Sequence, residues 1–236
     1  MTQSHSIFIK EQNLVTMCGR YTLTKPLKEI ESHFGPLHIN LDYRPSYNIA
    51  PSQLSSVVIN SSGQKYLTTM KWGLVPSWAK DEEMKLINAR SETAHEKPSF
   101  KYSLRKQRCL IPADGFIEWK GTEKQPCYIY LKGQALFAFA GLWSTWNYPE
   151  GKSLHTYTIL TTEANKKLSS IHARMPIILP AEQYKVWLTS DSSLDAVRNA
   201  LTSFPSQEFD FHPISKEINR ASESNNSREL LRPITF

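Results

Sequence analysis

Apolar and polar residues alternate along most of this chain in short runs, a pattern typical of β-strands rather than of long helices. The clearest case spans residues 53–72, where QLSSVVIN and QKYLTTMKW flank Ser61–Gly63 and predict a β-hairpin closed by that turn. More strands are predicted by five apolar runs, the second of which follows the turn Ala113–Gly115: RCLIP, FIEWK, PCYIYL, ALFAFAGLW and HTYTIL.

Three segments repeat apolar residues at helical spacing instead. Residues 25–35 predict a helix that Thr24 caps and Gly35 ends, with one apolar face formed by Leu27, Ile30 and Phe34. Residues 181–188 and 193–201 predict two further helices. Hairpin-spaced strands with few helices, and no repeat or linker, favour a single α+β domain with a largely antiparallel sheet or a partly closed β-barrel core and flanking helices.

Composition narrows the class of protein without choosing a function. The 236 residues are 40% apolar and 21% charged, as in ordinary globular proteins, so disorder of the whole chain is not expected. A net charge of +6 permits an anionic partner such as nucleic acid. The first sixteen residues lack the apolar core of a signal peptide, and the apolar run at Ala135–Trp143 is too short to span a bilayer, so a cytoplasmic protein is expected.

Three cysteines, Cys18, Cys109 and Cys127, are an odd number with no close pair, which suggests neither a disulfide framework nor a zinc site. No metal or organic cofactor is indicated elsewhere in the sequence.

Five stretches combine polar residues with rigid turns: MCGRY, SYNIAP, WGLVPSW with the following INARSET, ADGFIEW and SIHARMP. Each stretch has an ordinary explanation. Cys18 could be a buried small hydrophobe, and Asn48 and Pro51 could mark a turn. Glu118 could be the outward residue of an alternating strand, His172 a satisfied histidine, and the tryptophans core residues.

Taken together, six blocks in order resemble the SOS-response-associated peptidase family (the SRAP domain), whose members recognise abasic sites in single-stranded DNA: CGRY, YNIAP, WGLVPSW, NARSET, RCLIPADGFIEW and IHARMPIIL. The resemblance runs from Cys18 to about Pro233. The closing INRASESNNSRELLRPI is a looser version of the family's tail, so we assign no role to its residues.

The resemblance implies a covalent reaction at an N-terminal cysteine. An abasic deoxyribose opens to an aldehyde, with which a 1,2-aminothiol forms an imine and then a thiazolidine ring. An α-amine has a pKa of about 7.7–8.0 against about 10.4 for lysine, so roughly a third of it is neutral near pH 7.5. A terminal cysteine is therefore a nucleophile that needs little tuning.

This chemistry requires a free amine, whereas Cys18 is acylated by Met17 in the sequence as written. We expect a leader, Met1–Met17, that is absent from or removed in the mature protein, followed by an SRAP domain over residues 18–236. Translation from Met17 is the favoured explanation, because MCGRY is already a complete opening. Self-cleavage by the Cys18 thiol is the alternative.

The resemblance also implies roles for other residues by position. Asn88 would orient the amine or the opened sugar, Glu118 would act as general base and acid, and His172 would move protons at the sugar oxygen. Six residues would contact DNA: Arg20, Asn48, Pro51, Trp72, Arg90 and Arg174. The arginines suit phosphates, whereas Pro51 and Trp72 would wedge or stack against bases. Core packing is favoured for Trp78 and Trp119.

The predicted function is that of an abasic-site sensor in the DNA damage response, which crosslinks itself to single-stranded DNA and shields the lesion. A second hypothesis is a cysteine peptidase in which His172 and Glu118 activate Cys18, and a third is a DNA-binding module with an inert Cys18. Self-cleavage and lyase activity stay open. The expected partner is single-stranded DNA that contains abasic sites, with no membrane, and the expected state is a monomer.

Overall fold

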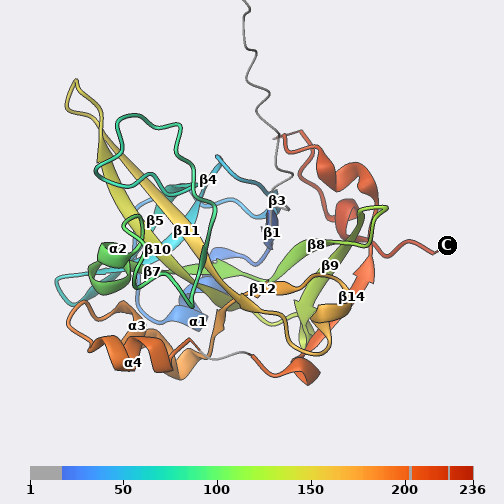
Figure 1. Cartoon of the computed structure of the whole chain (residues 1–236). Coiled ribbons are helices and arrows are strands. Elements are labelled where there is room, and N and C mark those ends of the chain that lie inside the picture. Colours follow the sequence, from blue (N-terminus) through green and yellow to red (C-terminus); the bar gives the residue numbers. More distant parts are fainter. Residues whose placement is uncertain (1–17, 202–203, 223, 236) are drawn as a thin grey trace, which may run out of the picture.

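The hairpin expected at residues 53–72 forms and becomes part of a closed ring of strands in the computed structural model, which describes residues 18–201, 204–222 and 224–235 (Figure 1). The ring runs through five strands: β4 (Leu54–Ser61), β5 (Gln64–Trp72), β11 (Ser153–Glu163), β10 (Phe137–Asn147) and β7 (Arg108–Ala113). Its neighbours are antiparallel except β11 and β5, whose parallel pairing at Tyr157 and Trp72 closes the ring. The prediction of a largely antiparallel, partly closed barrel is confirmed.

Short strands extend the barrel sheet at its edges. β12 and β6 pair with β11, β13 pairs with β10, and β2 pairs with β5. The pattern of the sequence did not reveal them, because two or three residues are too few to show a period. Their bounds are β2 (His38–Ile39), β6 (Asn88–Arg90), β12 (Arg174–Pro176) and β13 (Ile178–Leu179).

A second, five-stranded sheet lies beside the barrel and carries the N-terminal end of the described chain. Its order is β14 (Phe209–Pro213), β9 (Gln125–Leu131), β8 (Gly115–Lys120), β1 (Arg20–Leu23) and β3 (Ser46–Ile49). Gly115 begins β8 where a Cβ atom would lie 2.3 Å from the Tyr128 ring of β9. Only glycine allows this close approach, which fixes the start of the strand that carries Glu118.

Tyr21 joins this second sheet to the barrel. Its ring packs edge-on against Trp72 and Phe139, with centroids 5.2 and 5.9 Å apart, and its hydroxyl lies 2.7 Å from that of Tyr157. All four side chains are fully buried in the main hydrophobic core. Because aromatic rings contribute large buried areas, this contact holds β1 firmly against β5, β10 and β11.

Four short α-helices and six 3-10 turns complete the described chain. The helices are α1 (Leu27–Phe34), α2 (Lys101–Lys106), α3 (Tyr184–Leu188) and α4 (Leu194–Asn199). The turns are η1 (Lys132–Gln134), η2 (Leu168–Ser170), η3 (Ala181–Gln183), η4 (Ser206–Glu208), η5 (Lys216–Asn219) and η6 (Arg228–Leu231). The three predicted helices are confirmed, with η3 forming the first turn of the segment that was expected at 181–188.

The expected cap of α1 is wrong in one detail. Thr24 makes no capping bond to the helix, whose N-cap is Pro26. The backbone amide and the hydroxyl of Thr24 instead donate to the Asp114 carboxylate, at 2.7 and 2.5 Å. A charged carboxylate is a stronger hydrogen-bond acceptor than a neutral group. Gly35 ends the helix as expected, with a φ of +78°.

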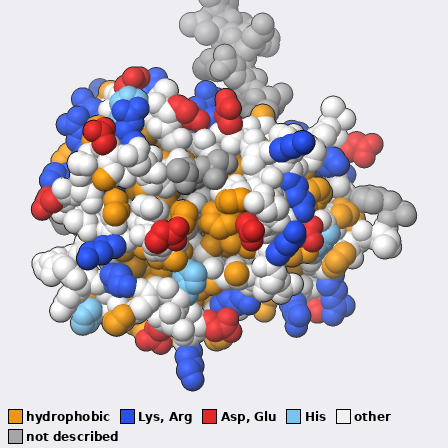
Figure 2. Space-filling model, turned by 90° about the horizontal axis from the view of Figure 1, so that it is seen from below, with side chains coloured by type: hydrophobic (Ala, Val, Ile, Leu, Met, Phe, Trp, Pro, Cys, Tyr) orange, Lys and Arg blue, Asp and Glu red, His pale blue; other side chains and the backbone are white. Residues whose placement is uncertain are grey.

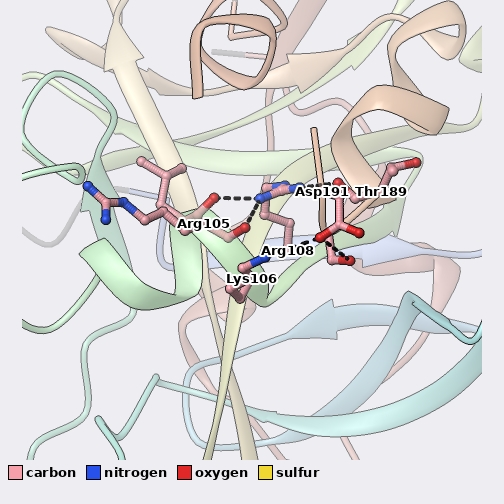
Figure 3. A network of polar contacts seen from close by, with 7 residues as sticks. Arg105, Lys106, Arg108, Thr189 and Asp191 are labelled. Atoms are coloured by element: carbon pink, nitrogen blue, oxygen red, sulfur yellow. Dashed lines mark hydrogen bonds and ion pairs between the residues drawn. The ribbon is translucent and has the colours of Figure 1, made fainter. Parts of the chain in front are cut away.

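Arg108 joins α2 to α3 (Figure 3). This buried guanidinium donates only to backbone carbonyls, those of Leu104 at 2.7 Å and Arg105 at 2.6 Å in α2, and those of Trp187 at 2.6 Å and Thr189 at the end of α3. The last carbonyls of a helix lack partners within it, so one side chain satisfies both ends.

Basic side chains are dispersed over the face seen from below in Figure 2, where Lys and Arg alternate with Asp and Glu and no single basic patch stands out. This face includes α1, α3 and α4 (Figure 1). The net charge of the chain therefore does not locate a binding surface by itself. Within the described ranges, no helix has the length and hydropathy needed to cross a membrane. The expected leader, Met1–Met17, lies outside the described residues.

Candidate active site

Cys18 and Glu118 are in direct contact. The backbone nitrogen of Cys18 donates to Oε1 of Glu118 over 2.6 Å. The contact lies just beyond the pairing of β1 with β8, whose last pair is Arg20 and Ile117. Cys18 has a φ of +40°, a conformation that costs energy for a residue with a side chain and is common at functional sites.

Both groups are buried, which changes their protonation. Burial raises the pKa of Glu118 to about 8, against the opposing effect of hydrogen bonds from the amides of Cys18 and Trp119. Burial and the nearby Glu118 charge raise the pKa of the Cys18 thiol well above its usual value. Near neutral pH the thiol is therefore protonated, and the carboxyl exchanges its proton in the range suited to general acid and base catalysis.

Glu118 does not point outward as an alternating strand would place it. It is only 2% exposed, on a strand whose first four residues are all buried. Alternation fails here because both faces of β8 are covered. The ordinary explanation of Glu118 as a surface residue is therefore wrong.

Asp114 holds β1, the first described strand, in place, although the sequence predicted only a turn at this residue. Oδ1 accepts from the Thr22 hydroxyl at 2.5 Å, and Oδ2 accepts from Thr24. The Asp114 amide in turn donates to the Thr22 carbonyl at 3.0 Å. This exchange ties β1 to the turn that precedes β8, and so fixes Cys18 relative to Glu118.

Asn88 and Arg90 lie on β6, at the edge of the barrel sheet. β6 pairs in parallel with β11, where Asn88 is opposite Ile159 and Arg90 opposite Thr161. Asn88 is half-buried and Arg90 is exposed. β11 also pairs with β12 on its other side, where Glu163 is opposite Arg174.

His172 is oriented by the backbone of Arg174. Its Nδ1 lies 3.1 Å from the Arg174 nitrogen and 3.2 Å from the Arg174 carbonyl oxygen. The N–H can donate to an unprotonated Nδ1, and the carbonyl can accept from a protonated one, so Nδ1 has a partner in either tautomer of the neutral ring. One residue thus offers Nδ1 a partner in both charge states.

Both terminal nitrogens of the Arg174 guanidinium already have protein partners. Nη1 and Nη2 donate to the two carboxylate oxygens of Glu92 at 3.1 and 2.8 Å, and Nη2 also donates to the Thr161 carbonyl at 2.8 Å. The sequence assigned this arginine to DNA phosphate without a competing partner. Glu92, in the same NARSET block as Asn88, was missed.

Arg20 and Asn48 contact the C-terminal segment, to which the sequence assigned no role. Nη2 of Arg20 donates to the Asn219 carbonyl at 3.3 Å, and Nδ2 of Asn48 donates to the carbonyls of Ile218 and Arg220 at 3.2 and 3.0 Å. Burial lowers the pKa of Arg20, and the described residues offer it no carboxylate partner. Arg20 therefore keeps an uncompensated charge beside Cys18.

The two tryptophans of the WGLVPSW block lie in opposite settings. Trp72 is fully buried, donates from Nε1 to the Ile87 carbonyl at 2.9 Å and stacks on Tyr157. This burial contradicts the prediction that Trp72 stacks on bases. Trp78 is 56% exposed, which contradicts its expected place in the core. Trp119 is partly buried, with Nε1 donating to the Asn219 side chain at 3.0 Å, and Pro51 is partly exposed in the turn before β4.

The site offers no evident place for a metal ion. Among the described residues, no three His, Cys, Asp or Glu side chains lie close enough together to bind one. A cavity of about 830 Å³ lies between α1, the β4–β5 hairpin and α3, but none of the predicted site residues lines it.

Comparison with known proteins connects this arrangement to a family. The sequence pattern described as SOS response associated peptidase (SRAP) matches residues 17–221. The Bacillus subtilis proteins "Abasic site processing protein YoqW" and "YoaM" are each 43% identical, over 91% of this chain and 99% and 97% of theirs. The Gallus gallus protein "Abasic site processing protein HMCES" is 36% identical over 81% of this chain and 67% of its own length.

Solved structures agree with the sequence comparison. A crystal structure of a Bacteroides thetaiotaomicron protein matches with a TM-score of 0.78 and 25% identity, over 92% of this chain and all of that one. A Bordetella bronchiseptica protein matches with a TM-score of 0.74 and 25% identity over 84% of this chain. The resemblance noted from the six motif blocks is confirmed, and this chain belongs to the SOS response associated peptidase family.

Proposed function

We propose that this protein processes abasic sites in single-stranded DNA by bonding covalently to them through the amine and thiol of Cys18. The observation that carries the proposal is the 2.6 Å contact between the Cys18 nitrogen and Glu118. A carboxyl whose pKa is about 8 lies against the one atom that must lose a proton to become a nucleophile. The relatives are named abasic site processing proteins, which supports the same substrate.

The reaction begins once Cys18 has a free amine. Glu118 accepts a proton from the terminal ammonium, and the neutral amine adds to the C1′ aldehyde of the opened sugar. Loss of one water gives an imine, with Glu118 returning a proton to the departing oxygen. The Cys18 sulfur then bonds to the imine carbon while the thiol proton passes to the nitrogen, and the thiazolidine ring is closed.

His172 and Asn88 act on the sugar in this proposal. The His172 ring, with Nδ1 held by Arg174, presents Nε2 as the atom that protonates the sugar ring oxygen during opening. Asn88, fixed on β6 by its pairing with β11, orients the amine or the opened sugar. Both roles need a rigid backbone, which the paired strands supply.

The DNA strand is held mainly through its phosphates. Arg20 and Arg90 are the phosphate ligands in this proposal, because one has no carboxylate partner among the described residues and the other is exposed. Asn48 and Pro51 lie on β3 and in the following turn, where they border Cys18's sheet. The exposed Trp78 replaces Trp72 as the candidate for stacking on a neighbouring base.

The cysteine peptidase is the weaker hypothesis. A peptidase of this kind needs a thiolate, whereas burial and Glu118 raise the pKa of the Cys18 thiol. His172 uses Nδ1 to contact Arg174, and no carboxylate of the described residues bonds to it in the manner of a catalytic triad. Self-cleavage after Met17 remains compatible with the proposal, since it needs a single turnover.

Mass spectrometry of the purified full chain, with and without an abasic single-stranded oligonucleotide, separates the three hypotheses. We expect a protein that begins at Cys18 and gains the mass of the oligonucleotide less one water. The change Cys18→Ser should abolish the heat-stable product, and Cys109→Ala, at another buried thiol, should not. A heat-stable adduct of protein that still begins at Met1 would disprove the proposal. Peptide hydrolysis without an adduct would favour the peptidase, and binding without either would favour the inert module.

A further inference from the structure

Asn219, in the C-terminal segment, contacts both strands that carry the residues assigned to the reaction. Its side-chain oxygen accepts from Nε1 of Trp119 at 3.0 Å, and its carbonyl accepts from Nη2 of Arg20 at 3.3 Å. Trp119 follows Glu118 on β8, and Arg20 begins β1, two residues after Cys18. One residue of the C-terminal segment therefore bridges β1 and β8 beside the candidate site.

Asn48 of β3 holds the backbone on both sides of Asn219. Its Nδ2 donates to the Ile218 carbonyl at 3.2 Å and to the Arg220 carbonyl at 3.0 Å, with one hydrogen for each. Asn48 is only 4% exposed, and the Ile218 side chain is fully buried. Loss of these bonds would leave a buried amide without partners, which is costly. The carbonyl of Asn219 is therefore fixed between two anchored neighbours.

Arg20 keeps hydrogen-bond donors for a phosphate in this arrangement. Nη1 donates to the Gly19 carbonyl at 2.7 Å and Nη2 to that of Asn219, and each of these nitrogens carries a second hydrogen. The two carbonyls have no net charge, so they orient the planar group and leave its positive charge for DNA. A carboxylate at the same distance would offset that charge.

We propose that Asn219 is a positioning residue, which joins Trp119 to Arg20 and holds the Arg20 guanidinium for a DNA phosphate without neutralising it. The inference rests on the proposed role of Arg20 as a phosphate ligand. It gives the C-terminal segment a part in DNA binding, which the motif blocks did not indicate. The residue at this position has to be an uncharged acceptor, because a negative charge here would compete with the phosphate.

The test adds a charge at Asn219 in the full chain and the same charge at Asn226 as a control. Oδ1 of Asn226 accepts from the Tyr47 amide at 2.6 Å, so Asn219→Asp and Asn226→Asp each keep an acceptor in the same segment. We expect Asn219→Asp to weaken binding of single-stranded DNA and to reduce the salt slope by roughly 0.7, as Arg20→Ala does. Asn226→Asp should leave the slope unchanged.

A double variant shows whether the new charge acts through Arg20. In an Arg20→Ala background, Asn219→Asp should reduce the salt slope no further, because the charge that it offsets is gone. A further reduction of roughly 0.7 in that background would overturn the proposal. An unchanged slope in Asn219→Asp, or in Arg20→Ala itself, would also overturn it.

Asn219→Ala tests positioning without a change of charge. It removes the acceptor of the Trp119 indole and should weaken DNA binding about twofold to tenfold, the range for one net hydrogen bond. Trp119→Phe removes the same bond, so the double variant should bind no more weakly than either single one. In NMR spectra the Trp119 indole N–H signal should shift in Asn219→Ala and stay in place in Asn219→Asp. A shifted signal with unchanged DNA affinity in Asn219→Ala would overturn the positioning role.

These binding measurements use single-stranded DNA without an abasic site, so they do not depend on the covalent step. If Asn219→Asp loses salt dependence as expected while even the unaltered protein forms no crosslink with abasic DNA, the positioning role holds and the proposed function fails. If the unaltered protein forms the crosslink and Asn219→Asp keeps full DNA affinity, the proposed function holds and the positioning role fails.

Discussion

The backbone nitrogen of Cys18 lies 2.6 Å from Oε1 of Glu118, although one hundred residues separate the two along the chain. The contact joins the first described residue to the strand β8, whose carboxyl is almost completely buried. A buried carboxyl with one close donor is sensitive to the charge on that donor. If the Cys18 amide became a terminal ammonium, as we propose, both the stability and the chemistry of the site would change.

Glu118 should make the stability of the full chain depend on pH. Its pKa rises from 4.5 to about 8 on folding, so between these values the folded protein keeps a proton that the unfolded chain releases. The contribution is complete below pH 4.5 and is lost as the pH rises to about 8, at no more than about 1.4 kcal/mol per unit. Urea unfolding at pH 5, 7 and 9 measures this slope.

The matched control is Glu118→Gln, which should remove that part of the slope. Protein that begins at Cys18 should also show a smaller slope, because its ammonium lowers the pKa of Glu118. Parallel stability curves for the full chain and Glu118→Gln would show that the carboxyl titrates normally.

Glu118 and His172 should differ in their response to an opened sugar. Glu118→Gln and His172→Gln should each slow crosslinking by roughly ten- to a thousandfold, the usual range for a lost acid or base. An aldehyde analogue that is already open should restore much of the rate of His172→Gln but not that of Glu118→Gln, because only His172 is assigned to ring opening. Single-turnover assays on both substrates measure this, and equal recovery of the two variants would refute the division of roles.

The three arginines should differ in their effect on salt dependence. Arg20→Ala and Arg90→Ala should each weaken binding to every DNA sequence alike and reduce the salt slope by roughly 0.7, the value for one phosphate contact on a single strand. Arg174→Ala should leave the slope unchanged, because the Glu92 carboxylate already offsets the charge of its guanidinium. Fluorescence anisotropy over a salt series tests this. If only Arg174→Ala reduced the salt slope, Arg174 would be the phosphate ligand, and Arg20 and Arg90 would not be.

The two tryptophans should separate binding from stability. Trp78→Ala should weaken DNA binding by about 1–3 kcal/mol, the contribution of one stacked base, with little loss of stability since the ring is exposed. Trp72→Ala should lower the free energy of unfolding by about 3–5 kcal/mol, because it leaves a cavity in the core. Binding and urea unfolding of both variants give the comparison, and unchanged DNA affinity in Trp78→Ala would remove it from the binding surface.

The local pattern of apolar and polar residues predicted the longer strands and helices of this fold but not the short strands. The β4–β5 hairpin and α1 each contain enough residues to show a period, so both were predicted within a few residues. β6 and β12 have three residues each, and they form because the end of β11 presents backbone groups to a neighbour on each side. Their existence depends on the tertiary fold and could not be read locally.

The candidate site was predicted as a list of residues but not as a set of contacts. The motif blocks located Cys18, Glu118 and His172, whereas the contacts of Asp114 with Thr22 and of Glu92 with Arg174 join residues more than eighty positions apart. A single sequence contains no signal for such pairs. The same limit explains the tryptophans, since two identical residues in one motif gave no indication of which was buried.

The burial of Cys18 bears on how long the protein lasts in a cell. Peroxides and alkylating agents consume thiolates that they can reach, whereas this sulfur is protonated and shielded from solvent. In the proposed function each Cys18 reacts with one abasic site, so an oxidant that reached the sulfur first would inactivate the molecule. Under that proposal, burial protects the sulfur until DNA brings an aldehyde to it, and selectivity arises from access rather than from exceptional reactivity of the sulfur.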